Sequence, residues 1–249
     1  MFTRDEREQI RTALVSAARQ DPMIAAAAHL GSAAADRLDE WSDIDLALCV
    51  SPGAELDEAV GEWTRRLYHD YGAVAHCDVR RGHTLYRVFL LHSTLQVDIS
   101  FWSPGEFRAV GPHFELIFGV QNEPQPTPAV SADELIGFAW LYALHVRCSV
   151  ARNRLLQAEY MLSNMRSQVL ALACLRQGLP TRDGRGFDDL PDEKRRAFED
   201  CYPASIHAEE LHRALRSAMA VLLTEIRRRN HDLAVNIESV LLEIAGLDV

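Results

Sequence analysis

The sequence predicts an α+β fold, with a mixed sheet and helices in the first half and an all-helical bundle in the second. Two segments, 43–50 and 95–102, alternate apolar and polar residues as strands with one apolar face do. Beyond residue 131 the apolar residues recur at helical spacing. The segment 121–131 holds three prolines and is typical of a linker or an ordered crossover. We therefore expect two domains, 1–125 and 126–249.

Further elements are expected in the first half of the chain. Apolar residues among charged neighbours predict an amphipathic helix that Asp21-Pro22 ends. The run Met23–Leu30 is open: its alanines favour a helix, whereas its length and the glycine that follows allow a buried strand. The β-content is expected almost entirely before residue 103. The predicted helices are 4–20 and 55–71, and the additional predicted strands are 73–79 and 85–91.

The second half carries clear helix signals. Ser131 with Glu134 forms a capping-box pattern for a helix that runs to about residue 150. Gly178 and the proline after it end a second helix over 152–177. Two more helical patterns complete the bundle, and the last one is expected to break near Asn230. These helices are predicted over 192–200 and 207–246.

Composition narrows the function classes. The chain has 249 residues, a formal net charge of −10 and no apolar run near the roughly 20 residues that span a bilayer. Its charged N-terminus lacks a signal-peptide core, so a cytoplasmic protein without a membrane partner is expected. The five cysteines form no C-x-x-C pair. The acidity disfavours a nucleic-acid partner and fits a cationic small substrate, although solubility alone explains it equally well.

Three carboxylates carry the chemical signal. Asp43 and Asp45 lie two apart on a predicted strand, so their side chains leave the same face, and Asp98 lies on another predicted strand. If the two strands are neighbours, the three side chains converge. Two Mg²⁺ ions held by oxygen ligands can neutralise a reacting phosphate. Upstream, Gly31-Ser32 forms a turn whose backbone N–H groups can approach that phosphate. The alternative is a solvated strand edge and an ordinary turn.

The spacing of Gly31-Ser32, Asp43-Ile44-Asp45 and Asp98, with a helical half behind them, resembles the DNA polymerase β-like nucleotidyltransferase superfamily. More narrowly, residues 31–46 are similar to the aminoglycoside and lincosamide nucleotidyltransferases. The resemblance implies that Asp43 and Asp45 bind metal and that Asp98 is a metal ligand or the base. It also implies that Gly31 and Ser32 contact the triphosphate. The chain departs from many relatives at 33–37, where Arg37 stands in place of a glycine and could replace a lost phosphate contact.

The acceptor has weaker signals. Arg152, Glu159 and Arg166 are seven apart and are expected on one face of the helix 152–177. On the functional reading, Arg152 contacts phosphate while Glu159 and Arg166 bind the acceptor. On the alternative reading, the row is a set of surface ion pairs worth little. Ser42 is a further candidate contact for a phosphate, and the general base is left open between Asp98 and Glu159.

The resemblance implies transfer of a nucleoside monophosphate to a hydroxyl of a small acceptor, with release of pyrophosphate. AMP from ATP is expected, with two Mg²⁺ ions, and the acceptor is expected to be an aminoglycoside or lincosamide antibiotic, a resistance function. Two alternatives remain. The first is a protein or tRNA acceptor, and the acidity of the chain argues against tRNA. The second is an inactive nucleotide-binding module, and the three retained carboxylates argue against it. A homodimer is left open.

Overall fold

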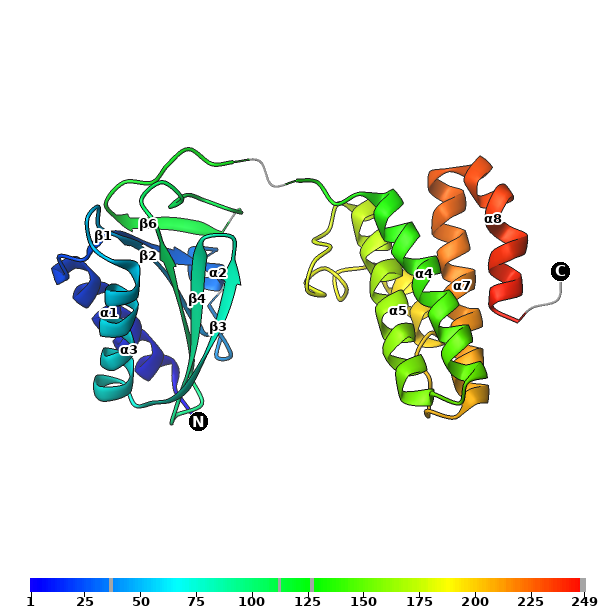
Figure 1. The fold of residues 1–249 in the computed structure, drawn as a ribbon, viewed down its shortest axis with the longest axis horizontal. Helices are drawn as coiled ribbons and strands as arrows, with labels where there is room; N and C mark the ends of the chain where they lie inside the picture. The colour runs from blue at the N-terminus through cyan, green and yellow to red at the C-terminus, as the bar shows by residue number, and fades with distance from the viewer. Residues whose placement is uncertain (36–37, 112, 126–127, 247–249) are drawn as a thin grey trace. The chain divides into compact units, whose positions relative to one another are not determined.

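A computed structural model describes residues 1–35, 38–111, 113–125 and 128–246. The chain divides into two compact units, Met1–Thr127 and Pro128–Val249 (Figure 1). The first is a sheet with helices and the second is helical, so the predicted α+β class is confirmed.

The first unit is built on one six-stranded sheet in the order β3-β4-β5-β2-β1-β6. The neighbours β2 and β5 run parallel, whereas the other neighbouring pairs run antiparallel, so the sheet is mixed. In the parallel pair Asp45 lies directly opposite Asp98. The strands are β1 Ile24–Leu30, β2 Ile44–Val50, β3 Ala73–Arg81, β4 Thr84–Leu91, β5 Gln96–Trp102 and β6 Phe114–Phe118.

Two helices, α1 (Arg4–Gln20) and α3 (Leu56–Asp70), lie on one side of this sheet (Figure 1). Leu46 of β2 belongs to the core on that side, together with Leu14 of α1 and Trp63 of α3. Each helix begins with acidic residues in its first turn, which the helix dipole favours.

The opposite side of the sheet corrects one expectation. The alternation in 43–50 predicted a strand with one apolar face, yet Ala47 and Cys49 are buried as well. They pack in a second, smaller cluster with Trp102 and Phe107. The small side chains of Ala47 and Cys49 leave room for these aromatic rings, and β2 is consequently buried on both faces over most of its length.

The strands β1 and β6 lie at one edge of the sheet. The open segment Met23–Leu30 forms a strand, because it pairs with β2 on one side and β6 on the other. The strand β6 itself lies beyond residue 103, where little β-structure was expected. It is an edge strand without a fully buried side chain, so it lacks the one-sided alternation that marks a strand in a sequence.

The second unit is a bundle of helices around one apolar core (Figure 1). The Ser131 hydroxyl accepts a hydrogen bond from the Glu134 N–H, as the capping pattern predicted. The expected break near Asn230 is confirmed, and the Asn230 side chain caps the helix that follows by accepting from the Leu233 N–H. The helices are α4 Ala132–Ala151, α5 Leu155–Gln177, α6 Asp192–Glu199, α7 Ala208–Arg229 and α8 His231–Ile244.

None of the helices among the described residues is both long enough and apolar enough to cross a membrane.

Candidate metal centre

The three predicted carboxylates converge in the first unit. Asp45 lies on β2 and Asp98 on β5, opposite each other in the parallel register, and Asp43 immediately precedes β2. One ligand oxygen from each of the three carboxylates lies within 4.8 Å of the others, and each residue is half-buried. Directly paired residues in a sheet project from the same face, so the strand pairing itself produces this cluster. Its oxygen-only donor set is the type that Mg²⁺ prefers.

Gly31 completes the cluster from the side of β1. It begins the short helix α2 (Gly31–Ala34) in the left-handed backbone region, with φ +59°. A Cβ at this position would lie 2.1 Å from Oδ2 of Asp45, which no real contact allows. Glycine is therefore required here for two reasons: the backbone adopts a left-handed conformation, and the Asp45 carboxylate occupies the space that a Cβ would fill.

Gln96 is a residue of the site that the sequence analysis did not identify. Its side-chain amide donates to Oδ1 of Asp98 at 3.0 Å and to Oδ2 of Asp43 at 3.3 Å. Gln96 lies two residues before Asp98 on β5, so strand alternation puts both on one face. The spacing of two residues on a predicted strand could have identified Gln96 from the sequence. Its amide hydrogen-bonds to two carboxylates that would otherwise repel each other.

Asp98 has a perturbed pKa. Burial raises the pKa of this carboxyl from 3.8 to about 6, against the lowering effect of the Gln96 hydrogen bond, and the negative charge of Asp43 raises it further. Protonated oxygens do not bind cations well, so metal binding at this cluster is expected to displace a proton near neutral pH.

Three of the other residues predicted to contact the nucleotide are Ser32, Ser42 and Arg37. Ser32 is half-buried in the first turn of α2, beside Gly31. The Ser42 hydroxyl donates to Oδ1 of Asp39 at 2.8 Å and accepts from the Asp39 N–H at 2.9 Å, which closes the loop before β2. Arg37 lies outside the described residues. Phosphate contacts by Ser32, Ser42 and Arg37 stay predictions.

The helical unit separates the predicted row of charged residues. The helix expected over 152–177 begins at Leu155, and Arg152 is the C-cap of α4, so it does not share the face of Glu159. Arg166 is only 7% exposed. Its guanidinium donates to the Cys201 carbonyl at 3.1 Å and stacks 4.0 Å above a tyrosine ring. Arg166 thus faces the interior of the helical unit, while Glu159 is half-buried on α5.

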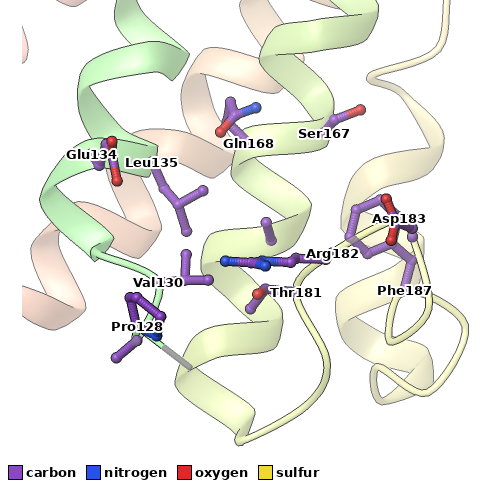
Figure 2. Close-up of a pocket in the computed structure, with 13 residues that line it drawn as sticks. Pro128, Val130, Glu134, Leu135, Ser167, Gln168, Thr181, Arg182, Asp183 and Phe187 are labelled. Carbon is purple, nitrogen blue, oxygen red and sulfur yellow. The ribbon is translucent and has the colours of Figure 1, made fainter. Parts of the chain in front are cut away.

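A separate pocket of about 570 Å³ lies within the helical unit. Figure 2 shows the Arg182 side chain extending into the space beside Val130 and Leu135. Apolar side chains and charged side chains of both signs line this pocket, and the sequence analysis assigned it no role. Its lining residues are Pro128, Ala129, Val130, Glu134, Leu135, Ser167, Gln168, Ala171, Thr181, Arg182, Asp183, Gly184 and Phe187.

Comparisons with known proteins find likeness in structure and none in sequence. No family model matches the chain, and no curated protein matches its sequence. The structure is similar to that of an aminoglycoside 6-adenyltransferase from Bacillus subtilis. The match covers 98% of this chain and 92% of the other, with 12% sequence identity and a TM-score of 0.35.

Proposed function

We propose that the chain transfers a nucleoside monophosphate, AMP from ATP, to a hydroxyl of a small-molecule acceptor and releases pyrophosphate. The observation that carries the proposal is the cluster of Asp43, Asp45 and Asp98, on and directly before two adjacent strands, beside Gly31. Three carboxylates gathered on rigid elements are costly unless a cation neutralises them. When bound, Mg²⁺ neutralises the charge of the triphosphate and of the leaving pyrophosphate.

The residues of the chain would divide the work as follows. Asp43, Asp45 and Asp98 would hold the metal, and the turn at Gly31 and Ser32 would contact the phosphates. Asp98 accepts the proton of the attacking hydroxyl, whose oxygen forms a new bond to the α-phosphorus. The bond from that phosphorus to the bridging oxygen breaks, and pyrophosphate leaves with the electron pair. Positioning and electrostatics supply most of the catalysis in such transfers.

For the acceptor we propose an aminoglycoside or a lincosamide, which would make the chain an antibiotic-modifying enzyme. The resemblance of residues 31–46 supports this choice, and the net charge of −10 favours a cationic acceptor. Glu159 stays the predicted contact for the acceptor in the helical unit.

A mass-spectrometric screen tests the reaction. Aminoglycosides and lincosamides are incubated with ATP, GTP, CTP or UTP and Mg²⁺, and the products are searched for an added nucleoside monophosphate. Asp45→Asn is expected to abolish pyrophosphate release with the fold intact. Asp57→Asn, on the exposed start of α3, is the matched control and should keep full activity. Normal turnover by Asp45→Asn would end the proposal, as would a wild-type chain that releases no pyrophosphate with any acceptor.

A further inference from the structure

Arg7 is a buried charge on the far side of the sheet from the carboxylates. It is the fourth residue of α1 and is 2% exposed, although arginine is almost never fully buried unless it is paired. Its Nη1 donates to the carbonyl oxygen of Asp39 and, at 3.2 Å, to that of Ser42. Its Nε donates to Glu8 at 3.2 Å. The guanidinium therefore bridges the helix and the loop before β2.

The two carbonyls mark the two ends of a short loop. The Ser42 carbonyl belongs to the peptide group that leads into Asp43, the first of the three carboxylates. The Ser42 hydroxyl closes the same loop by donating to the Asp39 carboxylate and accepting from the Asp39 backbone N–H. Because Arg7 holds the carbonyl next to Asp43, it fixes the direction in which the chain enters β2.

The same end of α1 also reaches the strand that carries the glycine turn. Glu8 accepts from Arg11 as well as from Arg7, with an Nε–Oε2 distance of 2.9 Å for Arg11. Arg11 then contacts Nε2 of His29 at 3.4 Å, two residues before Gly31. One polar network on α1 thus touches both segments that lead into the site, the end of β1 and the start of β2.

We infer that Arg7 is a positioning residue that holds Asp43 in place for cation binding, through the backbone of Asp39 and Ser42. This inference rests on the proposed function, since it assigns the cation affinity of the same cluster to a residue that does not touch the cation. A guanidinium has a planar fork that serves two carbonyls and a carboxylate together, whereas an ammonium is a point charge that cannot reproduce that geometry. The charge can therefore be kept while the positioning is lost.

The test is Arg7→Lys, measured by binding of Mn²⁺ alone with electron paramagnetic resonance of the free ion. Residues that support metal ligands from outside typically change affinity about 10- to 100-fold, so we expect Mn²⁺ to bind about tenfold more weakly. Arg19→Lys is the matched control. Arg19 also lies on α1 and donates to a backbone carbonyl, that of Ile117 at 2.9 Å, on β6. The Arg19→Lys variant should bind Mn²⁺ with the same affinity as the wild type.

The outcomes separate the two proposals. A wild-type chain that binds no Mn²⁺ ends the proposed function. A wild type and an Arg7→Lys variant that bind Mn²⁺ equally overturn the positioning role and leave the proposed function intact. If Arg7→Lys does not fold, Glu8→Gln decides, because Glu8 is partly exposed and orients Arg7 from outside. Weaker Mn²⁺ binding by Glu8→Gln with an unchanged melting temperature supports the inference, and unchanged binding overturns it.

Discussion

Asp98→Asn should make the metal-free protein more stable and inactive at the same time. Asparagine keeps the shape of the side chain, and its carbonyl oxygen can still accept from Gln96, which donates to Asp98 at 3.0 Å. The substitution removes a charge that is partly buried and close to Asp43. Stability and activity should therefore change in opposite directions, which simple damage to the fold would not produce.

The size of the gain follows from the pKa of Asp98. Burial first, and then the charge of Asp43, raise that pKa from 3.8 to about 6 against the Gln96 hydrogen bond. A shift of about two units corresponds to roughly 3 kcal/mol of unfolding free energy at most. Because Asp98 is only half-buried, solvent screening reduces this to about 1–2 kcal/mol. The melting temperature of the metal-free protein should rise by roughly 3–8 °C.

The pH dependence has a definite sign. The folded protein holds the Asp98 proton more tightly than the unfolded chain, so this group stabilises the fold below pH 3.8. That contribution is lost as pH rises through about 6. The advantage of Asp98→Asn should therefore be small at acid pH and reach its full size above the folded-state pKa.

The assay is thermal unfolding with EDTA below and above the pKa of Asp98, repeated with Mg²⁺. Mg²⁺ should stabilise the wild type and stabilise Asp98→Asn much less, because a ligand that binds only the folded state shifts its stability by mass action. Asp57→Asn removes an equal charge from an exposed helix start and should gain nothing. A wild type that is more stable than Asp98→Asn in EDTA above that pKa would refute the reasoning, as would retained nucleotidyl transfer by the variant.

Three further substitutions test other parts of the structure. Gly31→Ala should abolish Mn²⁺ binding, because a Cβ would lie 2.1 Å from Oδ2 of Asp45. The left-handed backbone strain should also lower the free energy of unfolding in urea by about 1–2 kcal/mol. Wild-type Mn²⁺ affinity in this variant would contradict the predicted clash. Asn230→Ala should lower stability by about 1 kcal/mol in thermal melts followed by circular dichroism, whereas Asn230→Asp keeps the cap of α8 and should not. Arg166→Met should cost about 2 kcal/mol in urea unfolding and leave the acceptor KM unchanged. A raised KM at unchanged stability would instead support the prediction that Arg166 contacts the acceptor.

The carboxylate cluster could be anticipated because it depends on local patterns and one pairing. Alternation gave the strands that carry Asp45 and Asp98, and the only long-range requirement was that β2 and β5 be neighbours. The strand β6 could not be anticipated in this way. It pairs with β1, whose paired residues lie between 84 (Leu30 with Phe114) and 91 (Ala27 with Phe118) positions earlier in the chain, and it has no buried face, so neither local alternation nor a turn signal marks it.

The helical unit shows a different limit. Helical periodicity predicted its elements well, but the spacing of seven between Arg152, Glu159 and Arg166 indicates a shared face only if one helix contains all three. The chain turns between α4 and α5, where Asn153 has a positive φ of 54°, and this break removes Arg152 from the row. Arg166 packs inward because the Cys201 carbonyl and a tyrosine ring receive its guanidinium. These partners are more than 30 residues away in the sequence.

The burial of Arg7 had a sequence signal, but helical periodicity alone does not explain it. In α1 it continues the stripe of Ile10, Leu14 and Ala18, so a charged residue stands where the helix meets the sheet. Such a position usually argues against burial, because an unpaired charge there is costly. The structure resolves the conflict through two loop carbonyls and Glu8. A positive charge on the apolar stripe of a helix therefore indicates that hydrogen-bond acceptors lie near it, and here two of those acceptors are carbonyls of the loop that leads into Asp43.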